Sequence, residues 1–343
     1  MQRARVNGMG LQKEPKIGVV LFQLGGPDSL EAVEPFLYNL FCDPDIIDFP
    51  FAKIARQPLA KLISISRAKK VRDHYAHIGG KSPIVEWTKR QAAALEEELR
   101  THQDARVAIA MRYWHPFTDE AIEKLRREEC NELVLLPLYP QYSHTTTRSS
   151  YNEWQRRFKP TMFPGANIHA IQSYHDHPAY IDCMVEKVNE TLARFPGEAR
   201  PHLVFSAHGV PVSVIQAGDP YQRHVEETTR LVLERGKWEL PFTVCYQSKV
   251  GSSRWLEPSI HTVTHQMAEK KERHVLVIPI AFVSDHIETL HEIDVEVREE
   301  MLALGVEQFE MMPGLNTSPK FIQTLVELVL ARVTKPALAA QAR

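Results

Sequence analysis

The amino-acid sequence predicts an α/β fold of two similar lobes, each built on a parallel four-stranded sheet with helices on both faces. Short apolar runs rich in β-branched residues recur along the chain, and most are followed by a stretch with helical periodicity. Such alternation is typical of parallel sheets covered by helices. The length of 343 residues suits two domains of roughly 150 residues each. We therefore expect a ligand cleft between two lobes.

The expected strands are identified by their apolar, β-rich composition. In chain order they cover residues 18–24, 106–111, 133–138, 167–173, 202–207, 242–247, 274–280 and 308–312. The expected helices show apolar residues at three- and four-residue spacing. They cover residues 88–99, 119–129, 178–194, 223–235, 259–271, 292–304 and 319–333.

An internal echo supports two related lobes. Residues 136–147 and 278–289 share a proline, a histidine and a final threonine at corresponding positions. The connection between the lobes is expected near residues 150–165. The segment 43–80 differs from the rest, because it is long, mixed apolar and basic, and lacks a clear strand. Two interpretations of it stay open: a lid or binding loop, or two ordinary helices of the first lobe.

Composition restricts the class of protein. The chain is 43% hydrophobic and 24% charged with a formal net charge of −2, which argues against a nucleic-acid-binding surface. Its 4 cysteines form no C-x-x-C pair, which argues against a zinc or iron–sulfur site within the chain and favours a reducing compartment. No secretion signal is visible, and no apolar run approaches about 20 residues. We expect a cytoplasmic protein, soluble or in peripheral contact with the inner membrane surface.

Titratable residues follow two of the expected strands, at the edge where open α/β sheets bind ligands. His208 follows strand 202–207 and would be a general base near neutral pH, or a residue that merely caps the strand end. Glu288, Glu292 and Glu296 are spaced four residues apart, so an α-helix would align them in one acidic stripe. This stripe would pass protons outward or metal ions inward, or would simply be a solvated helix face.

Two further residues begin the same expected helix. Asp285 and His286 stand directly before the acidic stripe and would extend a relay of protons or metal ions. The alternative for Asp285 is a structural one, in which its carboxylate caps the first helical amides.

Polar and aromatic residues also end three other strands. They are Met111, Arg112 and Tyr113 after the second strand, residues 139–143 after the third, and residues 247–251 with Trp255 after the sixth. Together they suit a large, planar, anionic ligand, because Arg and Lys would meet carboxylates while Trp and Tyr pack on a ring. Individually, each is more often structural. The chain lacks both the G-x-G-x-x-G spacing of dinucleotide sites and the G-x-S-x-G elbow of acyl transfer.

On these residues the chain resembles the ferrochelatase family over nearly its whole length. The motifs that carry the resemblance are LGGP at 24–27, YAHIGGKSP at 75–83, MRY at 111–113, LYPQYS at 138–143, FSAHG at 205–209, GDPY at 218–221, QSK at 247–249 and SDHIETL at 284–290. The resemblance implies that the protein inserts Fe2+ into a porphyrin in the last step of haem biosynthesis. A tetrapyrrole carrier without turnover, or a bilobed small-molecule binding protein, are the alternatives from other classes.

The resemblance also implies an organisation and a set of site residues. It implies a Rossmann-like lobe at 16–160 with a lid at 43–80, a second lobe at 161–316, a C-terminal helix at 317–335 that packs on the first lobe, and flexible tails at 1–15 and 336–343. His208 and Glu288 would be catalytic and contact the metal, with Asp285, His286, Glu292 and Glu296 as relay. The residues expected to line the porphyrin site are Leu24, Tyr75, Met111, Arg112, Tyr113, Ser143, Ser248, Lys249, Trp255 and Phe282.

Departures from the family pattern refine these expectations. Some members hold an iron–sulfur cluster, but His144 occupies the position of its first cysteine and no cysteine follows Cys245, so we expect no cluster. Arg148 replaces a frequent glycine and leaves the local loop geometry open. Leu24 stands where members that use coproporphyrin have a tyrosine, which predicts protoporphyrin IX as substrate and coproporphyrin III as the alternative. Residues 49–63 mix apolar and basic side chains and are expected to form a lip that touches the membrane surface.

Overall fold

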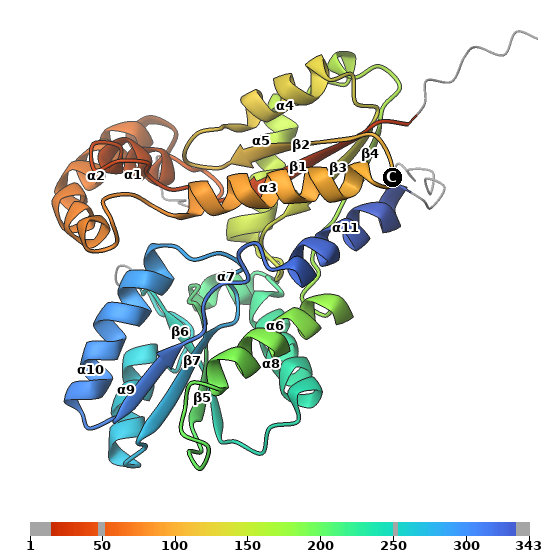
Figure 1. Cartoon of the computed structure of the whole chain (residues 1–343). Coiled ribbons are helices and arrows are strands. Elements are labelled where there is room, and N and C mark those ends of the chain that lie inside the picture. The colour runs from red at the N-terminus through yellow and green to blue at the C-terminus, as the bar shows by residue number, and fades with distance from the viewer. Residues whose placement is uncertain (1–14, 47–51, 250–252, 334–343) are drawn as a thin grey trace, which may run out of the picture.

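The computed structural model describes residues 15–46, 52–249 and 253–333, and Figure 1 shows two lobes, each with its own sheet. The first sheet has the order β2-β1-β3-β4 and the second has the order β6-β5-β7-β8, with all neighbours parallel. The strands are β1 (Ile17–Gln23), β2 (Ala105–Met111), β3 (Glu132–Pro137), β4 (Asn167–Ala170), β5 (His202–His208), β6 (Phe242–Gln247), β7 (His274–Pro279) and β8 (Gln308–Met311). The predicted fold class is confirmed, since all eight expected strands form.

Helices cover both faces of each sheet, as the alternating pattern predicts. They are α1 (Val33–Phe41), α2 (Ala52–His77), α3 (Ile84–Arg100), α4 (Thr118–Arg127), α5 (Ser149–Arg157), α6 (Pro178–Leu192), α7 (Val212–Gln216), α8 (Tyr221–Gly236), α9 (Ile260–Glu269), α10 (Arg298–Ala303) and α11 (Pro319–Val333). A 3-10 turn, η2, covers Pro160–Met162, and two π-helices, η1 and η3, cover His144–Arg148 and Glu288–Val297.

The alternation of side chains along the strands separates two cores in the first lobe. Ile17, Val19 and Leu21 of β1 enter one large core, which continues through α3, α6 and α11 into the second sheet. Val20 and Phe22 point to the other face and pack under α4 and α5. Helix α11 contacts α3, α6 and β3, so the end of the described chain returns to the first lobe (Figure 1). The expected tails, 1–15 and 336–343, lie outside the described residues, apart from Pro15.

The segment expected as a lid or two helices is mostly one long helix. Helix α2 runs over 26 residues and packs against α1, which sequence patterning did not identify. Lys61 of α2 pairs with Glu34 of α1 at 2.6 Å, and the Arg72 guanidinium donates to the Leu30 carbonyl at 3.1 Å. In Figure 1 this pair of helices lies at the left end of the first lobe.

The helix expected at 292–304 begins earlier and has a different winding. The chain forms the π-helix η3 from Glu288 and changes to the α-helix α10 only at Arg298. The expectation that Glu288, Glu292 and Glu296 lie on an α-helix is therefore wrong. π-Helical winding is rare and is frequently found at functional sites. Among the helices of the described residues, none has the length and apolar character needed to cross a membrane.

Candidate active site

Three neighbouring strands of the second sheet end at one histidine–glutamate pair. His208 is the last residue of β5, and Glu288 is the first residue of η3, which follows β7. The Nδ1 atom of His208 lies 2.8 Å from Oε2 of Glu288. Gln247 ends β6 on the other side of β5, and its Nε2 donates to the Glu288 carbonyl at 3.2 Å. The carboxyl edge of the sheet, where α/β folds bind ligands, thus holds a fixed acid–base pair.

Gly209 permits this close packing. Its amide donates to the Gln247 carbonyl oxygen at 2.8 Å. A Cβ atom at position 209 would lie 2.9 Å from that same oxygen and 3.2 Å from the Trp255 ring. Any larger residue would therefore push apart the strand ends that carry the pair.

A second carboxylate is joined to the pair through one serine. The Ser248 hydroxyl donates to Oε2 of Glu292 at 2.5 Å and lies 3.5 Å from Oε2 of Glu288. The Ser248 amide donates to Oε1 of Glu292 at 2.8 Å. Glu296, one step further, has a side chain that is 46% exposed. The acidic residues therefore run from a hydrogen-bonded interior to solvent.

The electrostatics assign different protonation states to these groups. Burial would lower the pKa of His208, but the charge and hydrogen bond of Glu288 and the charge of Glu292 raise it above the usual value. Burial disfavours the Glu288 carboxylate, yet His208, His286 and Ser248 lower its pKa to about 2. Burial and then the Glu288 charge raise the pKa of Glu292. Glu288 thus stays ionised, while Glu292 accepts a proton more readily than an ordinary glutamate.

Aromatic rings lie beside His208 and His286. The Trp255 ring meets the His208 ring edge to face at 6.4 Å between centroids. Phe282 lies 4.6 Å from the ring of His286. The His286 side chain is buried, its Nδ1 lies 3.2 Å from the Ser284 carbonyl, and burial lowers its pKa. These three predicted residues, Trp255, Phe282 and His286, lie near the pair, and the rings of Trp255 and Phe282 are only half-buried.

The Asp285 carboxylate holds the loop that leads to α11. Its two carboxylate oxygens accept from the Gly314 amide at 2.8 Å and from the Asn316 side chain at 2.7 Å. Asn316 also accepts from the Asp285 amide at 3.1 Å and, through its carbonyl, from Gln91 of the first lobe at 2.8 Å. Both oxygens of Asp285 are engaged, so this residue fixes the loop before α11, and its part in a relay stays a prediction.

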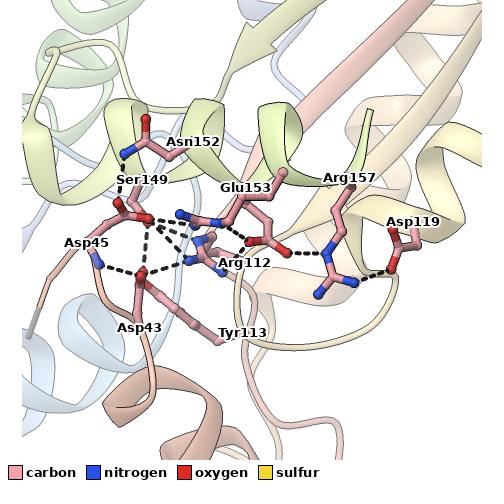
Figure 2. Close-up of polar contacts among 10 residues, drawn as sticks. Asp43, Asp45, Arg112, Tyr113, Asp119, Ser149, Asn152, Glu153 and Arg157 are labelled. Atoms are coloured by element: carbon pink, nitrogen blue, oxygen red, sulfur yellow. Dashed lines mark hydrogen bonds and ion pairs between the residues drawn. The ribbon is translucent and has the colours of Figure 1, made fainter. Parts of the chain in front are cut away.

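Arg112 lies in an ion-pair network of the first lobe (Figure 2). Its guanidinium lies 2.8 Å from Asp43 and 3.6 Å from Asp45, and it donates to Ser149 at 2.9 Å. The Tyr113 hydroxyl donates to the same Asp43 at 2.6 Å. These contacts hold Arg112 and Tyr113 in the first lobe, and their contact with a porphyrin stays a prediction.

Three other residues expected to line the porphyrin site are buried. Tyr75, Met111 and Ser143 are each nearly inaccessible. The Ser143 hydroxyl donates to Asp219 of the second lobe at 2.8 Å, so it joins the two lobes. Met111 packs with Ile84 on the first sheet.

Leu24 and Lys249 have more open positions. Leu24 is half-buried and packs on the same apolar cluster as Tyr75 and Ile287, the residue before Glu288. Lys249 is exposed directly after Ser248. The sequence pattern identified Gln247 as a polar strand end but did not identify Asp43, the partner of Arg112, which has no local signal.

Comparison with known proteins identifies the family of this chain. The family model described as ferrochelatase matches residues 16–333. The ferrochelatase of Aquifex aeolicus is 48% identical over 314 residues, covering 92% of this chain and 98% of that one. The ferrochelatase of a Synechocystis strain is 44% identical over 324 residues, covering 94% and 84%. A solved structure titled SirB from Bacillus subtilis with Fe3+ has a TM-score of 0.52, covers 93% of this chain and 94% of that chain, and at 13% identity shows the fold alone. The chain belongs to the ferrochelatase family, lyases that insert a metal ion into a porphyrin.

Proposed function

We propose that this enzyme inserts Fe2+ into protoporphyrin IX to give protohaem and two protons, with His208 as the proton acceptor. The observation that carries the assignment is the contact of 2.8 Å between His208 and Glu288 at the carboxyl edge of the second sheet. A porphyrin holds two pyrrole N–H protons, so a base beside the ring must remove them before four nitrogens can bind iron. Imidazole is suited to this task near neutral pH.

Glu288 stabilises the imidazolium and does not itself carry the proton onward. Its pKa of about 2 makes it a poor proton acceptor, and its charge is what raises the pKa of His208. Glu292 has the opposite tendency, because its pKa is raised, and the Ser248 hydroxyl connects it to Glu288. A proton released by His208 therefore leaves through Ser248 and Glu292 toward the exposed Glu296.

The groups around the base provide a binding surface for the macrocycle. Trp255 and Phe282 supply aromatic faces for a flat ring, and burial of such faces contributes strongly to binding. Lys249 is exposed beside Ser248 and would pair with a propionate at the rim. Half-buried Leu24 adds an apolar wall, which favours the vinyl groups of protoporphyrin over the extra propionates of coproporphyrin III.

The same proposal includes no tightly bound cofactor and no iron–sulfur cluster. Cys130, Cys183 and Cys245 lie buried in different parts of the core. Burial raises the pKa of Cys130 to about 11 and that of Cys245 to about 12, which holds both as thiols and not as the thiolates that bind metal. Iron analysis of the purified protein tests this part, with acid-labile sulfide as the contradicting result.

Peripheral contact with the inner membrane surface from the cytoplasm is a further part of the proposal. Helix α2 exposes Leu59, Leu62 and Ile65 at 37%, 65% and 53%. These leucine and isoleucine side chains recur every three residues on one side of the helix, beside exposed lysines at 61 and 69. The expected lip also includes residues 49–51, which lie outside the described residues. Flotation with anionic liposomes at low salt tests the contact, and loss of flotation in Leu62→Glu supports it.

Anaerobic incubation with Fe2+ and protoporphyrin IX tests the enzymatic assignment directly. We expect the fluorescence of the free porphyrin to disappear and the absorbance of protohaem to grow with enzyme concentration. Binding of porphyrin without any metal-dependent loss of fluorescence would instead identify a tetrapyrrole carrier.

A further inference from the structure

A second group of metal-ligating side chains lies where the two lobes meet. His74 comes from α2 of the first lobe, whereas His291 and Glu296 come from η3 of the second. One potential ligand atom from each of the three lies within 4.8 Å of the other two. The rings of His74 and His291 are stacked with centroids 4.2 Å apart, and His291 Nδ1 lies 3.8 Å from Glu296.

His291 points to a different side of η3 from Glu292 and the acid–base pair. Glu292, the neighbour of His291 on η3, bonds to Ser248, whereas His291 contacts α2. Helix α2 and η3 are in direct contact, so the histidines stand at a junction of the lobes. His291 is buried, His74 is half-buried and Glu296 is exposed, so one side of the group opens to water.

We propose that His74, His291 and Glu296 bind a divalent first-row transition-metal ion that links α2 to η3. Two imidazoles and one carboxylate are a donor set that suits Zn2+ or Fe2+, with water to complete the coordination. Donor atoms about 2.0–2.2 Å from such an ion lie roughly 3–4 Å apart. The two stacked rings therefore have to turn so that one nitrogen of each points to the same ion.

A fourth residue is placed to orient the site. His77, one turn after His74 on α2, has its Nδ1 3.1 Å from Nε2 of His291. A hydrogen bond on one ring nitrogen fixes the orientation in which the other binds a metal. Burial also lowers the pKa of both His74 and His291, which favours the neutral imidazole that metals require. His77 is therefore a positioning residue.

Zinc titration of the full-length His208→Ala protein tests the site without the acid–base pair. We expect Zn2+ to bind with a stoichiometry of one per chain by calorimetry. Adding His74→Ala should weaken binding by more than about tenfold, because a direct ligand matters at least as much as its hydrogen-bonding partners. Zn2+ should also slow amide hydrogen exchange in α2, since the ion joins this helix to the other lobe.

Matched variants distinguish Zn2+ binding at this site from non-specific Zn2+ binding by surface histidines. His261 and His265 flank Glu300 on the surface at 2.7 and 3.5 Å, so His261→Ala removes a histidine from a similar group. It should leave Zn2+ affinity unchanged. Glu296→Gln alters an exposed side chain, which keeps the test valid if His74→Ala unfolds. Zn2+ affinity that stays equal to that of the parent chain in both His74→Ala and Glu296→Gln, or a loss of affinity only in His261→Ala, would overturn the proposal. The result does not depend on turnover.

Discussion

The two lobes have the same sheet topology but use their strand ends differently. Each sheet has its first strand in the second position and its third strand beside it, so β1 corresponds to β5 and β3 to β7. In the second lobe, β5 ends at His208 and the segment after β7 begins η3 with Glu288. In the first lobe, β1 is followed by Leu24, and the segment after β3 begins the π-helix η1 with His144.

The two similar sequence segments, 136–147 and 278–289, occupy corresponding places in the two lobes. His144 and His286, the shared histidines, both follow the third strand of their sheet just where the chain turns into a π-helix. Ser143 and His144 use their polar groups to hold Asp219 of the other lobe, at 2.8 and 2.7 Å. Glu288 instead holds His208. The segment after β3 therefore connects the two lobes, whereas the corresponding segment after β7 supplies the glutamate of the acid–base pair.

The first lobe also contains a histidine–glutamate pair, but this pair lies at the amino edge of its sheet and not at the carboxyl edge. His169 of β4 lies 2.8 Å from Glu132, the same separation as His208 and Glu288. Glu132 is the first residue of β3, at the amino edge of the sheet, away from the edge where α/β folds bind ligands. A close pair alone does not make an active site; its position on the sheet and its neighbours do.

The largest expected difference between the lobes is in turnover. His208→Ala should reduce kcat by about 10²–10⁴-fold, the usual contribution of a general base, while protoporphyrin still quenches tryptophan fluorescence on binding. His169→Ala removes the base of the equivalent first-lobe pair and should leave kcat near normal. Metal-dependent porphyrin fluorescence measures both, and near-normal turnover in His208→Ala would disprove its role as the base.

Glu288→Gln should change both the rate and its pH dependence. His208 must be neutral to accept a proton, so kcat/KM should fall as pH decreases through its raised pKa. Without the Glu288 charge, burial dominates and lowers the pKa of His208, so this acidic limb should move to lower pH. The plateau rate should also fall, because the imidazolium loses its stabilising carboxylate. The double variant with His208→Ala should be little slower than His208→Ala alone. If the acidic limb of the pH profile does not move in Glu288→Gln, Glu288 does not control the pKa of His208.

Substitutions in the ion-pair network around Arg112 should lower the stability of the protein more than its turnover. Asp43 has a fully buried side chain that accepts hydrogen bonds from Tyr113 and Ser149 and pairs with Arg112. Asp43→Ala would leave a buried guanidinium without its main partner and should lower the free energy of unfolding by about 3–5 kcal/mol.

A surface pair from the same region provides the control for Asp43. Asp119 pairs with Arg157 at 3.1 Å, but its side chain is 60% exposed (Figure 2). Asp119→Ala should cost less than about 1 kcal/mol in denaturant titrations. Similar losses for the two variants would show that the Asp43 network does not anchor the lobe.

Local pattern predicted most of the fold, because strands and helices are set by apolar periodicity. The His208 and Glu288 positions were also predictable, since a polar residue directly after a buried strand marks the carboxyl edge. The partner of Arg112 was not, because Asp43 is remote in sequence and only folding brings the two together. The π winding of η3 was missed for a similar reason. Its four-residue spacing of carboxylates suits an α-helix, and only the contact with Ser248 shows where Glu292 points.

The smallest expected effect is on the choice of porphyrin, to which the first lobe contributes through Leu24. Leu24 follows β1 as His208 ends β5, so the first lobe contributes an apolar side chain where the second contributes the base. We expect kcat/KM to favour protoporphyrin IX over coproporphyrin III by about tenfold or more, because an unpaired propionate against Leu24 would lose its hydration. Leu24→Tyr brings a hydroxyl that can bond to a carboxylate and should reduce the preference. Leu302→Tyr, on exposed α10, should not. If the unmodified enzyme prefers coproporphyrin III, Leu24 does not determine the substrate, although the chelatase assignment still holds.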